Sequence, residues 1–341
     1  MENKTKLKML LLLGISCISI VLAVGIGSVF IPPVDILSIL GSRLLGKAVP
    51  YNIDPVYEAL VMNMRLPRVA LAFLVGAMLS VSGTVMQSVL KNPLASPFGL
   101  GISAGAGLGA TLVIVSGASV GFLGMILLPI VSFGFGLFTV VLIMAVAACI
   151  DHSMSNTTII LLGMVVSLFF SAVMDLLAAI SPEYAQRINL WQLGSFSLKD
   201  WSSVWVLIPV AMFCLAVFLG AAREMDIMTF GEEQAQSLGI NLKRSKWGLM
   251  ICVAVMTGAA VAFAGIIGFV DLIAPHVVRK FFGSAHRKVL PASALFGGTF
   301  MVLCDLVSRT IASPREIPVG SVTALIGVPF FVYIYFVKKH N

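Results

Sequence analysis

Residues 121–149 read GFLGMILLPIVSFGFGLFTVVLIMAVAAC, and no charged side chain interrupts them. A helix needs about 20 apolar residues to cross a bilayer, so this segment is long enough to span a membrane. Similar apolar runs recur from one end of the chain to the other, and no polar stretch between them is large enough to fold separately. We therefore expect one transmembrane domain over residues 1–341 and no soluble domain.

The composition favours an all-α membrane protein. Apolar residues make up 59% of the chain and charged residues 11%, against about 45–50% and 25% in soluble domains. About ten crossings are predicted, near residues 9–30, 66–90, 95–116, 121–149, 157–180, 202–222, 246–266, 268–282, 288–311 and 318–337. The eighth is short and contains Pro275, so we expect a broken segment that needs protein or water around it.

The net charge of +7 reflects membrane orientation better than nucleic-acid binding. The basic residues are scattered in short loops between apolar runs. With a cytoplasmic N-terminus, 14 of them lie in inside loops and 8 in outside loops, which together make the 22 Lys and Arg residues. This is the excess that the positive-inside rule requires. The sequence thus predicts a multi-pass chain with both termini in the cytoplasm and no nucleic-acid partner.

Two glycine patterns concern helix packing. Intervals of seven and ten residues separate Gly76, Gly83 and Pro93, and the same intervals separate Gly258, Gly265 and Pro275. An inverted internal repeat would explain this, as in many transporters, although 31 Gly and 15 Pro residues also make matched spacings easy to find by coincidence. The second pattern is Gly101, Gly105 and Gly109. It favours close helix packing over a nucleotide loop, because no strand precedes it.

Catalytic and metal-binding patterns are weak. Residues 41–47 read GSRLLGK, but a phosphate-binding loop needs Ser or Thr next, and residue 48 is alanine. If transport uses ATP, the ATPase must therefore be another polypeptide. The histidines lie far apart, and none pairs with Cys, Asp or Glu at metal-ligand spacing. No nucleophile elbow or HExxH helix is present in the sequence either. We predict a transport subunit with no metal site rather than an enzyme.

The cytoplasmic loop from Asp226 to Lys246 contains helix signals. Thr229 and Glu232 fit a capping box, residues 232–238 fit a short helix, and Gly239 suits a left-handed stop. A capped helix outside the membrane favours a docking role for a partner, and an ordinary loop helix at the lipid surface is the alternative.

Three acidic residues lie in or near apolar runs, where an ionised carboxylate usually faces a partner or water. Asp305 has Arg309 four residues later, which favours an ion pair over a proton relay. Asp175 and Asp271 have no partner visible in the sequence, so lining a wet cavity is the only role that we predict for them.

Motifs along nearly the whole chain carry a family resemblance. They are Met64-Arg65-Leu-Pro-Arg68-Val, Ser82-Gly83 to Asn92-Pro93-Leu94-Ala95, Trp191-Gln-Leu-Gly194-Ser195, Gly231-Glu-Glu-Gln-Ala235-Gln-Ser-Leu238-Gly239, Gly265-Ile-Ile-Gly268-Phe269, Ala274-Pro275-His276, His286-Arg-Lys-Val-Leu-Pro291, Asp305-Leu-Val-Ser-Arg309 and Glu316-Ile-Pro318-Val-Gly320 continuing to Gly327-Val-Pro329. In this order and spacing, the chain resembles the FecCD-type permease subunits of bacterial ABC importers for iron-siderophores, haem and vitamin B12.

The resemblance implies the type II ABC importer fold, with ten helices per subunit and two identical or related subunits around the pathway. It implies a multi-pass protein of the bacterial cytoplasmic (inner) membrane in contact with lipid. Its partners would be an extracytoplasmic substrate-binding (lipo)protein and a separate ABC ATPase. ATP and Mg would bind to that ATPase, and this chain would hold no cofactor.

Site residues follow from the same resemblance. The coupling helix that contacts the ATPase would comprise Gly231, Glu232, Glu233, Ala235, Leu238 and Gly239. Exposed arginines at 65, 68 and 309 would meet acidic residues of the binding protein, with anchoring at the membrane interface as the alternative. The cytoplasmic gate would comprise Asn92, Leu94, Ser155 and Asn156. Asp271 departs from the small residue usual in the family and is expected near the external end of the seventh crossing, where it would tune ligand or partner contact.

For function, the resemblance ranks an iron-siderophore above haem and cobalamin as the transported ligand. A secondary transporter driven by an ion gradient remains the alternative from another class. A purely structural membrane protein is the third.

Overall fold

The computed structural model describes residues 2–27, 29–50, 53–118, 121–151 and 154–337. Within these ranges the chain forms helices and connecting loops, without a strand. The helices are α1 (Glu2–Gly25), α2 (Pro33–Leu44), α3 (Pro55–Leu60), the π-helix η1 (Val61–Arg65), α4 (Leu66–Val89), α5 (Ile102–Val115), α6 (Gly121–Ile150), α7 (Asn156–Ile180), α8 (Pro182–Gln192), α9 (Trp201–Gly220), α10 (Ala222–Met228), α11 (Glu232–Ser237), α12 (Leu242–Ala264), α13 (Val270–Phe282), α14 (His286–Thr310) and α15 (Val319–Val337).

Each of the ten predicted crossings overlaps one of these helices. In the described ranges, seven helices are long and apolar enough to cross a membrane by length and composition. The other three predicted crossings fall on α5, α13 and α15. Helix α5 has 14 residues and is about 21 Å long at 1.5 Å per residue, which is less than a bilayer core of about 30 Å. The predicted fold class is confirmed, although α5 and α13, with 14 and 13 residues, are shorter than a full span.

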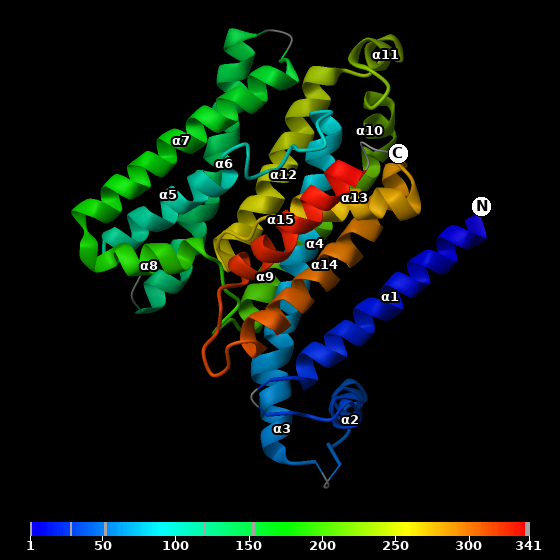
Figure 1. The fold of residues 1–341 in the computed structure, drawn as a ribbon, viewed down its shortest axis with the longest axis vertical. Helices are drawn as coiled ribbons and strands as arrows, with labels where there is room; N and C mark the ends of the chain where they lie inside the picture. Colours follow the sequence, from blue (N-terminus) through cyan, green and yellow to red (C-terminus); the bar gives the residue numbers. More distant parts are fainter. Residues whose placement is uncertain (1, 28, 51–52, 119–120, 152–153, 338–341) are drawn as a thin grey trace.

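Helix α4 lies at the centre of the bundle and packs against α9, α12, α13 and α14 (Figure 1). Small residues bring α4 and α14 into close contact. A Cβ atom on Gly76 would lie 2.3 Å from the carbonyl oxygen of Gly297, and one on Gly297 would lie 2.3 Å from Cβ of Ser80. Such close approach stabilises the contact between membrane helices through van der Waals packing, because the hydrophobic effect does not drive helices together in lipid.

The predicted glycine face of the third crossing packs as expected. A Cβ on Gly105 would meet the hydroxyl oxygen of Thr139 at 2.0 Å, and one on Gly109 would meet the carbonyl oxygen of Val131 at 2.8 Å. Both neighbours belong to α6. The glycines therefore serve helix contact between α5 and α6, and Gly101 ends the preceding loop with φ +75°.

The predicted break of the eighth crossing lies before Pro275 rather than at it. Residues 265–269 are not helical, and α13 continues from Val270 through Pro275. Proline has no N–H to donate to the carbonyl four residues earlier, which is that of Asp271. A Cβ atom on Gly83 of α4 would lie 2.0 Å from this carbonyl oxygen, so glycine is needed at position 83.

The two halves of the suggested repeat do not share a structural setting. Gly83 lies inside α4, whereas Gly265 follows the end of α12 with φ +76°. Pro93 lies in the loop after α4, whereas Pro275 lies inside α13. The residues with matched spacing therefore do not occupy equivalent positions in the structure.

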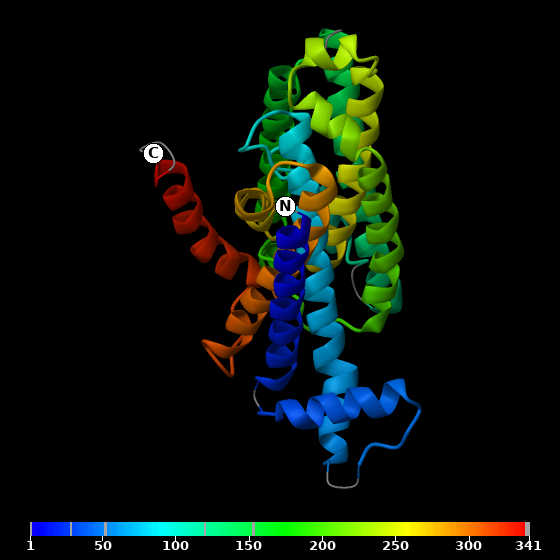
Figure 2. The same cartoon turned by 90° about the vertical axis from the view of Figure 1, so that its right-hand side faces the viewer.

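Several short helices at the ends of the bundle were not predicted. Figure 2 shows α2 lying across the lower end of the molecule, near α3. Gly41 to Leu44, the first part of the loop-like GSRLLGK stretch, belongs to helix α2. We call this end, with α2, α3 and residues 311–318, the α3 end. The opposite end, with α10, α11 and residues 90–94, 151 and 154–155, is the α11 end.

Candidate functional site

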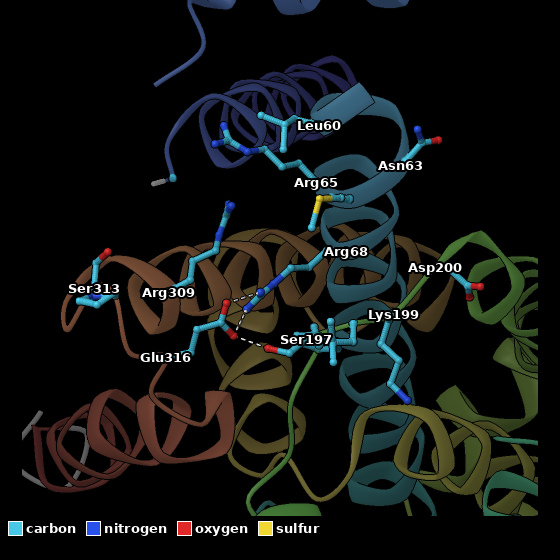
Figure 3. Close-up of a pocket in the computed structure, with 15 residues that line it drawn as sticks. Leu60, Asn63, Arg65, Arg68, Ser197, Lys199, Asp200, Arg309, Ser313 and Glu316 are labelled. Carbon is cyan, nitrogen blue, oxygen red and sulfur yellow. Dashed lines mark hydrogen bonds and ion pairs between the residues drawn. The ribbon is translucent and has the colours of Figure 1, made fainter. Parts of the chain in front are cut away.

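A cavity of about 610 Å³ opens at the α3 end. It lies between the start of α4, the segment before α9 and the segment after α14, and Figure 3 shows Arg68, Glu316 and Ser197 directed toward one another. The lining residues are Gly27, Leu60, Asn63, Met64, Arg65, Arg68, Phe196, Ser197, Leu198, Lys199, Asp200, Arg309, Ser313, Pro314 and Glu316. All three predicted docking arginines thus line one cavity.

The π-helical turn Val61–Arg65 positions two of these arginines. Pro67 lies two residues after it and cannot donate a backbone hydrogen bond, and a π-turn is one way in which a helix accommodates such a break. Leu66 N donates to the carbonyl oxygen of Val61, five residues earlier. The helix continues through the turn and presents Arg65 and Arg68 to the cavity.

Arg68 is the centre of a buried ionic network. Its Nε and Nη2 atoms lie 3.0 and 2.8 Å from Oδ1 of Asp305, and its Nη1 atom lies 2.7 Å from Oε1 of Glu316. Asp305 is fully buried. Arg309 Nε lies 3.5 Å from Oδ2 of Asp305, which confirms the predicted ion pair. The guanidinium of Arg68 therefore binds two carboxylates that lie 237 and 248 residues away from it in the sequence.

Arg65 and Arg309 also bind the end of α1. Arg65 Nη1 donates to the carbonyl oxygens of Val24 and Gly25 at 2.8 and 3.0 Å, and Arg309 Nη2 donates to that of Ala23. The last carbonyls of a helix have no partner inside the helix, and positive charge near them is favourable. The two arginines therefore cap α1 and attach it to the bundle.

The expectation that these arginines are exposed is wrong. Arg65 is 7% exposed, and the side chains of Arg68 and Arg309 are 12% and 8% exposed. Buried cations require partners inside the protein, and carboxylates and helix-end carbonyls supply them here. Docking of a binding protein by these arginines stays a prediction.

Glu316 is the most accessible member of the ionic network, with a side chain 41% exposed. Burial raises its pKa, but hydrogen bonds from Arg68 and Ser197 and the charge of Arg68 outweigh this, so that the pKa lies below its ordinary value. Burial lowers the pKa of Lys199, on the far side of the cavity, while the charge of Asp200 opposes this shift. The cavity wall therefore carries both signs of charge.

At the α11 end, the predicted coupling helix forms over Glu232–Ser237. Gly239 has φ +84°. Its N–H donates to the carbonyl oxygen of Gln236 at 2.9 Å, and Ile240 N–H donates to that of Ala235 at 3.0 Å. These two bonds make a Schellman motif. The predicted left-handed stop at Gly239 is confirmed.

The predicted capping box does not form. The N-cap of α11 is Gly231, with φ +147° and no capping side chain. The Thr229 hydroxyl donates to the carbonyl oxygen of Asp226 at 2.6 Å, so it stabilises the end of α10. The side chain of Glu232 lies outside the described residues. The capping pattern failed because the chain turns at Gly231, two residues later than the pattern assumes.

Helix α11 has a buried face, and exposed apolar side chains flank it at both ends. Ala235 is fully buried against Met228 and Leu242. Leu238 and Phe230 are 68% and 78% exposed, and the predicted coupling residue Glu233 is also exposed. No role was predicted for Phe230 from the sequence, although it directly precedes the predicted segment.

The predicted gate residues make local bonds. Asn92 Oδ1 accepts from Leu94 N at 2.9 Å, and Leu94 is 48% exposed. Ser155 is the N-cap of α7, and its Oγ accepts from Thr158 N at 3.3 Å. Within the described parts of the chain, no hydrogen bond joins the pair Asn92 and Leu94 to the pair Ser155 and Asn156. The Oδ1 atom of Asn156 is buried and has no hydrogen-bond partner among the described residues. The gate stays a prediction.

Asp271 is not at the external end of a crossing as expected. It is 1% exposed in the first turn of α13. Its Oδ2 accepts a hydrogen bond from Ser96, in the loop after α4, and its backbone lies against Gly83 inside α4. It does not line the cavity at the α3 end. The other acid without a predicted partner, Asp175, is exposed on α7.

Comparison with known proteins places this architecture in a family. The FecCD transport family matches residues 12–337. The chain belongs to the FecCD transport family. One relative is YvrB of Bacillus subtilis, which is described as an uncharacterized ABC transporter permease. It is 38% identical to this chain over 324 residues, which cover 95% of this chain and 91% of YvrB.

Two further FecCD comparisons concern ligand and fold. The cobalamin import permease BtuC of Halobacterium salinarum is 39% identical over 284 residues, covering 83% of this chain and 75% of BtuC. A solved structure described as an inward-facing conformation of a metal-chelate type ABC transporter matches with a TM-score of 0.82 and 31% identity, covering 96% of this chain and 98% of that one. Other relatives are named as permeases for molybdate, hemin and Fe(3+) dicitrate. This chain is a multi-pass permease of the FecCD family of ABC importers.

Proposed function

We propose that the chain carries an iron-siderophore, or a related metal chelate, across the bacterial cytoplasmic membrane as the permease subunit of an ABC importer. An extracytoplasmic binding protein would deliver the ligand at the α3 end. A separate ATPase, holding ATP and Mg, would act at the α11 end, and this chain would bind no cofactor. A second permease subunit, identical or related, would complete the pathway.

The observation that carries the proposal is the form of α11. Its backbone is fixed by the Schellman motif at Gly239, and Ala235 anchors it to α10 and α12. Leu238 and Phe230 nevertheless remain largely exposed. Apolar side chains at the two ends of a rigid short helix suit a groove on a partner protein. A secondary transporter would have no use for such a contact.

The cavity at the α3 end supports delivery from outside. Its wall of arginine, lysine and carboxylate side chains suits a polar partner surface. Glu316 is accessible enough to exchange partners, whereas Asp305 is not. We infer that an acidic group of the binding protein would reach Arg68 by displacing Glu316. In this arrangement both termini lie in the cytoplasm.

The ligand class rests on the relatives. Their printed names include cobalamin, hemin, molybdate and Fe(3+) dicitrate, so a metal-bearing chelate or oxyanion is common to them. We rank a ferric siderophore first, and haem or cobalamin second. The large mixed-charge cavity suits weak multiple contacts, which a translocation route requires because tight binding would slow release.

The test is ATP-dependent uptake in vesicles containing this chain and its ATPase. The binding protein would be supplied in turn with a ferric siderophore, haem, cobalamin and molybdate. We expect stimulated ATP hydrolysis and uptake with a ferric siderophore, and none with an inactivated ATPase. Uptake by the chain alone under an ion gradient would instead establish the secondary transporter.

A further inference from the structure

A chain of short hydrogen bonds links α10 to α4 at the α11 end. Asp226 of α10 accepts from His286, the first residue of α14, with 2.5 Å between Oδ1 and Nδ1 and 3.0 Å between Oδ1 and the backbone N. On the other edge of the ring, Nε2 of His286 lies 2.6 Å from Oγ of Ser88, in the last turn of α4. His286 is 1% exposed.

The chemistry of the three groups fixes how they are joined. An ionised carboxylate has only acceptor oxygens, so the hydrogen between Asp226 and His286 belongs to Nδ1. This leaves Nε2 to bond the Ser88 hydroxyl. The imidazole is therefore a rigid spacer with one arm on α10 and the other on α4, and a low-dielectric setting strengthens both bonds.

Arg279, a cation, attaches α13 to the same turn of α4. Arg279 Nη2 donates to Oγ of Ser88 at 3.0 Å and to the carbonyl oxygen of Thr84 at 3.2 Å, and Nη1 donates to Oε1 of Gln87 at 3.1 Å. The end of α4 is thus held by side chains from two other helices. Figure 1 shows α10 near the end of α4 and the start of α14, in agreement with their contacts.

The positions of these residues along the chain connect the network to α11 and to the predicted gate. Asp226 lies in the short helix just before α11. Ser88 lies just before Asn92 and Leu94, the predicted gate residues. Movement of α11 would be carried to Asp226 by α10, and from Asp226 to the end of α4 through His286. Apolar contacts alone could slide, whereas two directional bonds to one ring cannot shift without breaking.

We propose that Asp226, His286 and Ser88 are positioning residues that transmit movement of α11 to the cytoplasmic end of α4. The inference rests on the proposed function, since it assumes that an ATPase moves α11. Each residue acts through the others and contacts neither ATP nor ligand. Loss of either bond is expected to uncouple ATP hydrolysis from transport.

The experiment measures uptake and ATP hydrolysis in the same vesicles, at equal amounts of assembled complex. Asp226→Ala removes the carboxylate that accepts both bonds from His286, and Ser88→Ala removes the hydroxyl that contacts His286 and Arg279. We expect about a tenfold fall in ligand transported per ATP for each, while hydrolysis by the partner continues. The matched control is Ser167→Ala, because Ser167 donates only to the carbonyl oxygen of Gly163 on α7, at 2.7 Å. It should keep the ratio of the unmodified protein.

Two substitutions at His286 test the two arms separately. Asparagine places an amide near the Nδ1 position and keeps the arm to Asp226, whereas glutamine reaches toward the Nε2 position and keeps the arm to Ser88. Both variants should be uncoupled, because a relay needs both arms. Combining Asp226→Ala with Ser88→Ala should be no worse than either alone, as is usual for residues that act as one unit.

The outcomes separate the relay from a structural role and from the proposed function. If the variants lower only the amount of folded complex and leave the transport ratio unchanged, or if the two single effects multiply, the relay is wrong. Either result would leave the proposed function intact, since the unmodified protein still transports with ATP. If the unmodified protein shows no ATP-dependent uptake with its ATPase, the proposed function itself fails.

Discussion

Replacing Asp305 with alanine should strongly destabilise the α3 end. The carboxylate is fully buried, and it accepts bonds of 3.0 and 2.8 Å from Arg68 and an ion pair at 3.5 Å from Arg309. Breaking a buried ion pair from one side costs about 3–5 kcal/mol, because a buried charge is left behind. Glu316 would still hold Arg68, so we expect the lower end of this range, about 3 kcal/mol.

We expect the loss of stability to arise from the buried charge that is left without its partner, and not from the net contribution of the ion pair itself. A double variant, Arg68→Met with Asp305→Leu, removes both members of this pair and fills the space with apolar groups, while Arg309 keeps its bond to the carbonyl oxygen of Ala23. Such replacements are often close to neutral. We therefore expect the double variant to be more stable than Asp305→Ala, with a coupling energy of about 1–3 kcal/mol in the double-mutant cycle.

The assay is reversible unfolding by SDS in mixed micelles, followed by tryptophan fluorescence. The control is Arg43→Met, because the Arg43 side chain is 60% exposed in its pair with Glu58. Exposed pairs contribute about 0–1 kcal/mol. If Asp305→Ala cost no more than Arg43→Met, the reasoning about buried charge at this site would be refuted.

Three other changes have equally definite expectations. Gly83→Ala would place a Cβ atom 2.0 Å from a carbonyl oxygen of α13, and should cost about 3 kcal/mol in the same titration. For Glu316, burial raises the pKa but the bonds and charge of Arg68 lower it further. Its contribution to stability should be complete above the ordinary pKa of about 4.3 and should disappear as the pH falls through the lower folded pKa. Glu316→Gln should remove this pH dependence. Gly239→Val forces a β-branched residue to φ +84°, and should uncouple ATP hydrolysis from uptake while Gly248→Val, equally uncrowded, does not.

Each of these expectations can fail in a distinct way. A Gly83→Ala variant of ordinary stability would show that α4 and α13 separate without cost. Parallel pH profiles for the unmodified protein and Glu316→Gln would remove the ionic role of Glu316. Equal transport ratios for the Gly239 and Gly248 variants would show that the end of α11 need not be fixed.

Much of the fold was predictable because apolar length is a local property of the sequence. All ten predicted segments overlap helices. The short helices α2 and α8 were missed, although Pro33 and Pro182 occupy the first helical turn in each, where proline is favourable. They lie outside the long apolar runs, so hydropathy gives no signal for them.

The site was less predictable because its bonds join distant residues. The spacing of four between Asp305 and Arg309 revealed one ion pair. Arg68 lies 237 residues from Asp305, and Ser88 lies 198 residues from His286. No periodicity connects such positions. The exposure of the arginines was predicted wrongly for the same reason, since their partners are only brought together by folding.

The most direct test of the account is a crosslink from α11. Leu238→Cys, in a variant whose five native cysteines are replaced, would place a thiol at an exposed position directly after the helix. In native membranes it should crosslink to a nucleotide-hydrolysing protein, and ATP should change the yield. If that cysteine reacts with soluble thiol reagents yet never crosslinks to such a protein in membranes that take up the ligand, another source of energy drives this permease.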